Sequence, residues 1–260
     1  MTYLAFARVA VLRNLTYRAG YWMSLTGTGS MVAIQYCLWS AVYSAASPAP
    51  GGMTLAQTLT YVLTARAASA FLSLDAGRGI NQRVRLGTIA TELARPVDLQ
   101  LALFFEGLGE AAFTLLAVSV PVFSLLALTG LVVVPPPATV LWFVASLLLA
   151  YLVMYALSFA VGLMGFWTGN GMGLTDFLEA GVVLFSGALV PLDFYPASLR
   201  SIAQVLPFQT IYHLPMSIFA GRTGSLPSSL ALQAGWAVLL ILAGRLAWHQ
   251  ARSVLMVQGG

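Results

Sequence analysis

Residues 139–167 read TVLWFVASLLLAYLVMYALSFAVGLMGFW, a run of 29 residues without a charged side chain. As a helix, such a run is ~44 Å long at about 1.5 Å per residue, and the hydrocarbon core of a bilayer is about 30 Å thick. Backbone exposed to lipid must also satisfy its own hydrogen bonds, as a helix does. The run therefore predicts a membrane-spanning helix and, with it, an all-α integral membrane fold.

The composition of the whole chain supports this prediction. Of the 260 residues, 59% are hydrophobic and only 8% are charged, whereas soluble domains carry about 25% charged residues. So little charge cannot cover a water-facing surface, and intrinsic disorder needs much more of it. At about 20 residues per span, the length allows six spans with short loops. Residues 1–260 are therefore expected to form a single transmembrane domain.

Apolar runs separated by loop-forming residues predict six membrane-spanning helices. They cover approximately residues 21–43, 55–74, 99–128, 139–167, 174–190 and 229–248. Ahead of them, residues 1–20 carry three arginines among apolar residues. A signal peptide would place its charges before its apolar core. Here they continue to Arg18, which favours an N-terminal helix lying in the membrane interface.

The region 191–222 is strongly apolar but interrupted by prolines. They divide it into pieces of about ten residues, each too short to cross a bilayer, and stand at Pro191, Pro196, Pro207 and Pro215. One interpretation is a re-entrant helical hairpin between spans five and six, and the other is an amphipathic loop on the membrane surface. We favour the re-entrant hairpin, since broken backbone at membrane depth is tolerated where protein covers it.

The arginines predict the orientation. All 12 basic residues are arginine. With the N-terminus inside, nine of them fall on the cytoplasmic side, Arg200 and Arg222 fall outside, and Arg66 lies within a span. This bias follows the positive-inside rule and places both termini in the cytoplasm. Because the arginines are spread along membrane edges instead of forming one patch, they indicate contact with membrane lipids and not with nucleic acid.

Several chemistries are excluded or disfavoured. Without lysine the chain cannot form a P-loop or a Schiff base. His213 and His249 fall on opposite sides of the membrane and Cys37 is the single cysteine, so no metal-binding cluster is expected. A protease dyad of Ser186 with His213 is conceivable, but the glycine that should stand two residues before the serine is missing. We expect no catalytic, cofactor or metal site in this chain.

The longest cytoplasmic connection, residues 75–98, carries a candidate docking segment. Residues 88–94 can form two helical turns that end before Pro96. Ile89 and Leu93, at i and i+4, give this helix an apolar face, and its polar face consists of Thr88, Thr91, Glu92 and Arg95. Two interpretations stay open. The helix docks into a groove on a cytoplasmic partner, or it lies on lipid head groups with its arginine at anionic lipid.

Arg66 is a charge inside a predicted span, and such a charge normally has a partner. If spans two and three form an antiparallel hairpin, Arg66 lies between Glu106 and Glu110 in depth at about 1.5 Å per residue. The two glutamates share a helix face at i and i+4. We therefore expect an Arg66–Glu106/Glu110 cluster. It serves either as a structural ion pair that fixes the hairpin register, which we favour, or as a pivot or lining group of a transport path.

Two stretches resemble a known family. Residues 87–96 read GTIATELARP, and residues 185–196 read FSGALVPLDFYP, continuing to Leu206-Pro207-Phe208. Their order and the expected topology resemble the permease subunit of ABC-2-type exporters, in particular a bacterial subgroup in which two related permeases are usually paired with one ATPase. The resemblance extends over nearly the whole chain.

The resemblance implies a non-enzymatic subunit of the bacterial cytoplasmic (inner) membrane. It implies a second permease, identical or related, and two ABC ATP-binding subunits that bind ATP and Mg. Substrates of such systems include drugs, peptides, lipids and glycans, moved by alternating access. The implied ATPase-coupling residues are Arg85, Gly87, Thr88, Ile89, Glu92, Leu93 and Arg95. The implied outer-gate residues are Pro191, Asp193, Pro196, Pro207, Phe208 and Pro215.

A stand-alone ion-coupled carrier is the alternative. Such carriers often show inverted repeats with matched broken helices in both halves, whereas here only the second half has a long broken region. A purely structural membrane scaffold ranks third, because it gives no reason for the charged tip between spans two and three.

Overall fold

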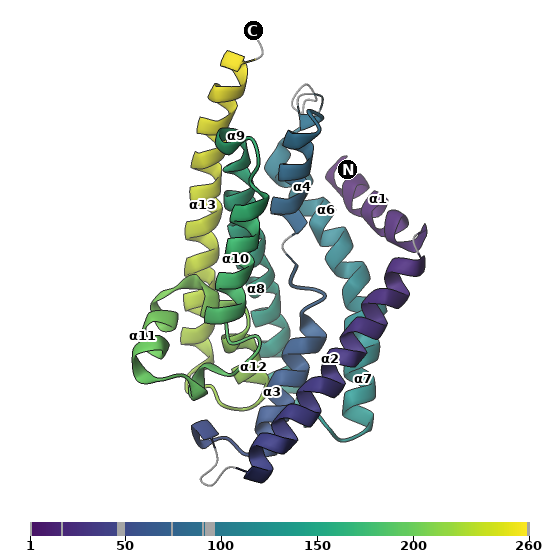
Figure 1. Ribbon diagram of the computed structural model, residues 1–260, viewed down its shortest axis with the longest axis vertical. Coiled ribbons are helices and arrows are strands. Elements are labelled where there is room, and N and C mark those ends of the chain that lie inside the picture. Colours follow the sequence, from purple (N-terminus) through teal and green to yellow (C-terminus); the bar gives the residue numbers. More distant parts are fainter. Residues whose placement is uncertain are drawn as a thin grey trace.

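The computed structural model describes residues 2–16, 18–45, 50–73, 75–89, 91 and 97–258. These residues form helices and connecting turns without β-strands, and most helices run along the long axis of the molecule (Figure 1). The predicted all-α class is confirmed. Within the described part, three helical stretches are long and apolar enough to cross a membrane: Leu99–Leu128, Pro137–Thr168 and Leu226–Ala251.

The first half begins with α1 (Thr2–Thr16) and α2 (Arg18–Ala45). Helix α3 (Leu55–Ala68) starts with a capping box, in which the Thr54 hydroxyl accepts from the Gln57 N–H and the Gln57 side chain accepts from the Thr54 N–H. This arrangement satisfies two backbone donors of the first turn.

Helix α3 ends before the expected boundary at residue 74. Ser69 follows its last residue and donates to the Arg66 carbonyl from both its N–H and its hydroxyl. Because this carbonyl then bonds within three residues instead of four, the α-helical pattern stops there. Turns continue the chain to residue 72.

Helix α4 (Asp75–Arg85) was not predicted, since its polar composition reads as a loop. It packs closely against α8 (Pro137–Leu163), and the Gly77 N–H donates to Ser158 Oγ over 2.8 Å. A Cβ atom at Gly77 would come within 2.5 Å of the Ser158 carbonyl oxygen. Glycine is therefore required for this approach.

One apolar rod consists of α6 (Leu99–Thr114), a π-helical turn η2 (Leu115–Ser119) and α7 (Val120–Leu128). Pro121 is the second residue after the π turn. Proline lacks an N–H and clashes with the carbonyl four residues earlier, and a π turn lets the helix continue past it.

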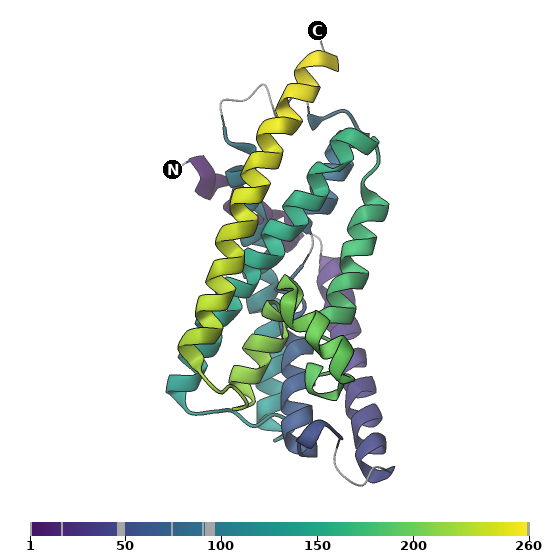
Figure 2. The same ribbon diagram turned by 90° about the vertical axis from the view of Figure 1, so that its left-hand side faces the viewer.

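The second half centres on α8, with α13 (Leu226–Gln258) packed along it (Figure 2). The short α9 (Gly165–Thr168) leads to α10 (Met172–Phe185). Helix α10 has only 14 residues, ~21 Å at about 1.5 Å per residue, and ends five residues before the predicted boundary at 190. Gly187 turns the chain there with a φ of 79°, a conformation that favours glycine.

The proline-rich region folds as four short helices. They are η3 (Leu192–Phe194), α11 (Ala197–Val205), η4 (Pro207–Thr210) and α12 (His213–Phe219). Pro191, Pro196 and Pro207 stand at the start of the first three, where a missing N–H costs no helical hydrogen bond. Helix α12 is buried against α8 and α3, whereas α11 exposes Ile202 and Val205.

Candidate functional site

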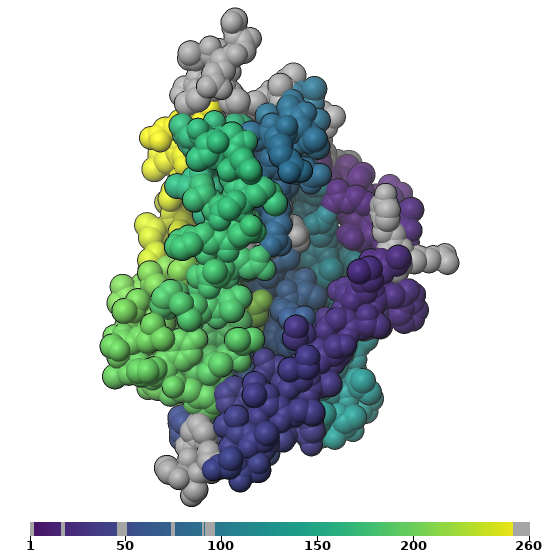
Figure 3. All heavy atoms as spheres, in the orientation of Figure 1, coloured from purple at the N-terminus to yellow at the C-terminus, as the bar shows by residue number. Residues whose placement is uncertain are grey.

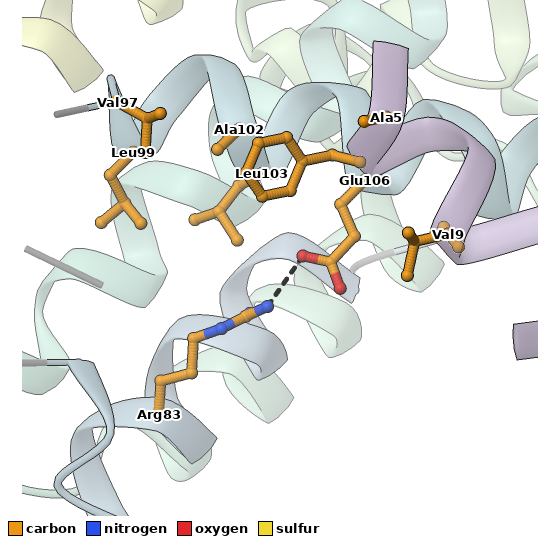
Figure 4. A pocket seen from close by; sticks show the side chains of 10 residues that line it. Ala5, Val9, Arg83, Val97, Leu99, Ala102, Leu103 and Glu106 are labelled. Carbon is orange, nitrogen blue, oxygen red and sulfur yellow. Dashed lines mark hydrogen bonds and ion pairs between the residues drawn. The ribbon is translucent and has the colours of Figure 1, made fainter. Parts of the chain in front are cut away.

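A cluster of charged side chains joins α1, α4 and α6. The carboxylate of Glu106 accepts from Arg83 over 2.7 Å and from Arg13 over 3.1 Å, and Glu110 also pairs with Arg13. Figure 4 shows the Arg83–Glu106 pair facing an apolar pocket of about 420 Å³ between α1 and α6. Glu106 and Arg83 are only about a fifth exposed, at 20% and 22%. The acids are thus paired inside the protein.

The predicted partner of these acids was wrong. Glu106 and Glu110 do form an ion cluster, but with Arg13 and Arg83 instead of Arg66. The depth argument treated spans two and three as adjacent helices with a loop between them. Helix α4 occupies that place and presents Arg83 to Glu106, while α1 lies along α6 and brings Arg13.

Charge counting could have found these two arginines. Two acids on one face of an apolar helix need more than one cation for neutrality, and Arg66 alone leaves one carboxylate uncompensated. The other arginines in the first half that could pair with Glu106 and Glu110 were those of residues 1–20 and of the 75–98 segment.

Arg66 instead lines a different cavity, of about 470 Å³, between α2, α3, α4, α8 and α10. Figure 3 shows the hollow between α2 and α10 on this face. The Arg66 Nε is buried without a hydrogen-bond partner, and no acidic side chain of the described residues forms an ion pair with it. At the α4 end of the cavity, Arg78 pairs with Glu179 of α10. Other lining residues include Met31, Gln35, Ser69, Leu72, Met154 and Val182.

Helix α4 is tied to α10 by a second contact. The side chain of Asn81 donates to Thr175 Oγ1 over 3.0 Å. Gly165 and Gly171 leave room for it, since a Cβ at either position would come within 2.1–2.2 Å of Asn81 Oδ1. Together with Arg83–Glu106, Gly77–Ser158 and Arg78–Glu179, this contact links α4 to α6, α8 and α10.

The predicted coupling residues are only partly described. Arg85 and Thr88 are exposed, and Gly87 turns the chain with a φ of 70°. Ile89, expected on a docking face, is only 5% exposed because it belongs to a hydrophobic cluster of its own chain that also contains Leu99. Glu92, Leu93 and Arg95 lie outside the described residues.

The predicted outer-gate residues lie in and around the proline-rich region. Asp193 faces Arg222, with 4.0 Å between Oδ2 and Nε. Phe208 stacks on Phe185 at the end of α10, with ring centroids 6.2 Å apart. Pro215 is buried in α12. The remaining members, Pro191, Pro196 and Pro207, begin the short helices as described above.

Backbone hydrogen bonds fasten this region to the bundle. The His213 N–H donates to the Ser186 carbonyl over 2.8 Å, and the Tyr61 hydroxyl donates to the Gly187 carbonyl over 3.0 Å. The side chain of His213 approaches Tyr61 and Ser217. Ser186 Oγ instead accepts from the Ala188 N–H. The conceivable Ser186–His213 dyad is therefore not formed. Within the described ranges, no group of three His, Cys, Asp or Glu side chains could hold a metal ion.

The family model described as "ABC-2 family transporter protein" matches residues 30–259, which is most of the chain. The chain belongs to the ABC-2 transporter family. No curated protein matches it. ABC-2 permeases are non-catalytic membrane subunits that normally pair with ABC ATPase subunits. The matched part of this ABC-2 protein contains α4, Arg66 and the proline-rich region. Arg13 and the cavity-lining residues Met23, Ser24, Gly27 and Thr28 precede it.

Proposed function

We propose that this chain is the permease subunit of an ATP-driven exporter of the bacterial cytoplasmic membrane. It assembles with two ABC ATP-binding subunits, which bind ATP and Mg, and with a second, identical or related permease. The complex moves an amphipathic substrate by alternating access, in which one site faces the two sides of the membrane in turn. The observation that carries the proposal is the set of polar contacts by which α4 is joined to α6, α8 and α10.

The proposed topology has six crossings and cytoplasmic termini. Helix α4 lies toward the same end of the molecule as both termini, and the loop between α7 and α8 lies at the other end (Figure 1). Most arginines accompany α4 at this end, as the positive-inside rule requires of a cytoplasmic face. Arg200 and Arg222 belong to the proline-rich region, for which we propose an outer position.

The proposed coupling route begins at residues 75–98. An ATP-binding subunit seated on the tip of this segment would push α4 when the ATPase dimer closes. The partly buried pair Arg83–Glu106 then passes the movement to α6, and the Asn81–Thr175 contact passes it to α10. The proline-rich region, attached to the end of α10, closes the outer side until α10 moves.

Co-purification tests this function. The permease is expressed with candidate ATP-binding subunits, and complex formation and ATP hydrolysis are measured after reconstitution into liposomes. We expect a stable, ATP-hydrolysing complex that the double change Glu92→Ala/Arg95→Ala weakens. Arg222→Gln, which removes a charge at the opposite end, is the matched control and should leave the complex intact. A chain that is stable alone and binds no ATP-binding subunit would favour the ion-coupled carrier.

A further inference from the structure

The cavity beside Arg66 carries an uncompensated positive charge. Among the described residues, its charged lining groups are Arg66, Arg78 and Glu179. Because Arg78 and Glu179 form an ion pair, their charges cancel and that of Arg66 remains. In contrast to the cluster at Glu106, no described carboxylate pairs with this arginine.

The position of Arg66 makes this charge costly. It stands in the last turn of α3 and is partly buried, and ten of the fourteen residues of this helix are buried. A charge among apolar helices is expensive and normally faces a partner or a functional cavity. A guanidinium also presents several N–H donors in a planar fork that matches the oxygens of a carboxylate or phosphate.

The other walls of the cavity supply a different surface. Met31 of α2, Leu72, Met154 of α8 and Val182 of α10 are apolar, and the polar residues Ser69 and Gln35 also line the cavity. The volume of about 470 Å³ lies within the range of about 300–1,000 Å³ typical of small-molecule sites. One end of the site is thus cationic and much of its wall is apolar.

We propose that this cavity binds an amphiphile whose single anionic head group, a carboxylate or phosphate, pairs with Arg66 while its apolar tail lies against the methionines and aliphatic residues of α2, α8 and α10. The claim that this amphiphile is also the transported substrate rests on the proposed exporter function. The binding site itself does not.

A direct binding measurement tests the site. Radiolabelled dodecanoate is titrated onto the full-length permease in a neutral maltoside detergent, with dodecyl phosphate, dodecyltrimethylammonium, acetate and inorganic phosphate as competitors. We expect dodecyl phosphate to compete and the cationic amphiphile not to. Acetate and inorganic phosphate lack the tail and should compete at least tenfold more weakly. Equal competition by the cationic amphiphile, or by the ions without a tail, would overturn the proposal.

Two substitutions that should change the affinity for dodecanoate in opposite directions distinguish an effect on binding from an effect on folding. Arg66→Gln should weaken dodecanoate binding about tenfold to a hundredfold, the range for one charge-assisted hydrogen bond. Glu179→Gln leaves the charge of Arg78 unpaired and should tighten dodecanoate binding severalfold. Arg8→Gln removes an exposed arginine that lines none of the cavities described above, and should change nothing. A folding defect would weaken binding in both cavity variants, so equal weakening in both contradicts the site.

If Arg66→Gln does not yield folded protein, Met31→Trp provides an independent variant. It fills the cavity without removing a charge and should abolish dodecanoate binding. Unchanged binding in Met31→Trp would place the ligand elsewhere and overturn the proposal.

ATP hydrolysis by the reconstituted complex distinguishes the site from the proposed function. Dodecanoate should stimulate hydrolysis by the wild-type complex and not by the Arg66→Gln complex. If no complex hydrolyses ATP but Arg66-dependent binding persists, the exporter function fails and the site stands. If the complex hydrolyses ATP normally but anionic and cationic amphiphiles bind equally and stimulate hydrolysis equally, the proposed binding site is wrong and the exporter function stands.

Discussion

The ion cluster at Glu106 and the cavity at Arg66 lie on two sides of the same helix, α4. They differ in whether their charged side chains are paired with one another. On one side, Arg83 of α4 reaches Glu106, and Arg13 completes a group in which two acids meet two cations. On the other, Arg78 of α4 pairs with Glu179, but Arg66 has no acidic partner among the described residues. In the first group every charge has a partner within the chain, whereas the proposed partner of Arg66 is a ligand.

This difference separates charges with a structural role, which are paired within the chain, from a charge that is available to bind a ligand. Removing one member of a paired group leaves an uncompensated charge and destabilises the fold. Removing an unpaired charge relieves the fold and affects only what the charge attracts. Stability and binding should therefore respond to different substitutions on the two sides of α4.

The largest expected loss of stability follows Glu106→Gln. This change removes the Arg83–Glu106 ion pair and leaves Arg13 paired with Glu110. We expect the free energy of unfolding to fall by about 2–3 kcal/mol, less than for a fully buried pair because these side chains are about a fifth exposed. The measurement is unfolding in mixed dodecyl maltoside and dodecyl sulfate micelles. Glu179→Gln, whose pair with Arg78 is nearly half exposed, is the control and should cost about 0.5 kcal/mol. Equal losses would remove the distinction between the two groups.

Arg83→Gln should have the second-largest effect on stability. Glu106 then keeps Arg13, so we expect a loss of about 1–2 kcal/mol. In a double-mutant cycle, Arg83→Gln together with Glu106→Gln should cost about 1 kcal/mol less than the sum of the single changes, because the two residues are in contact. Additive losses would mean that the pair does not form.

The apolar runs of the sequence predicted the long helices well but not the polar one. The expected span at 99–128 coincides with α6 to α7, and those at 139–167 and 229–248 lie within apolar helical stretches. Their boundaries are set by burial of apolar side chains, which a single sequence records directly. Helix α4 is mostly polar, and it is held by contacts to α6, α8 and α10 that come from distant parts of the sequence.

The same limit explains the wrong partner at Glu106. That the acids belong to an ion cluster follows from their spacing on one helix face. Which arginine reaches them depends on how α1 and α4 pack against α6. The depth argument favoured Arg66, and the charge count left every arginine of residues 1–20 and 75–98 as a candidate. The cavity at Arg66 could not be predicted from the sequence either, because its walls come from five helices.

A smaller effect is expected for Arg13→Gln. Arg13 touches both glutamates, but its side chain is 48% exposed, so water and salt screen its charge. We expect a loss of about 0.5–1 kcal/mol that shrinks when the salt concentration rises from about 0.05 M to about 0.5 M. The loss in Glu106→Gln should be less sensitive to salt. A salt-independent loss in Arg13→Gln would contradict the exposed position of this arginine.

The smallest effect on stability, and the sharpest test of the comparison, is expected for Arg66→Met. Methionine has a similar length without the charge, so it relieves the cost of an unpaired cation while it keeps the packing of the stem. We expect the free energy of unfolding to stay within about 0.5 kcal/mol of wild type or to rise by about 1 kcal/mol, measured in the same mixed micelles. Dodecanoate binding should be lost in the same preparation. A loss of stability as large as that of Glu106→Gln would show that Arg66 has a structural partner after all, and the two sides of α4 would then not differ in kind.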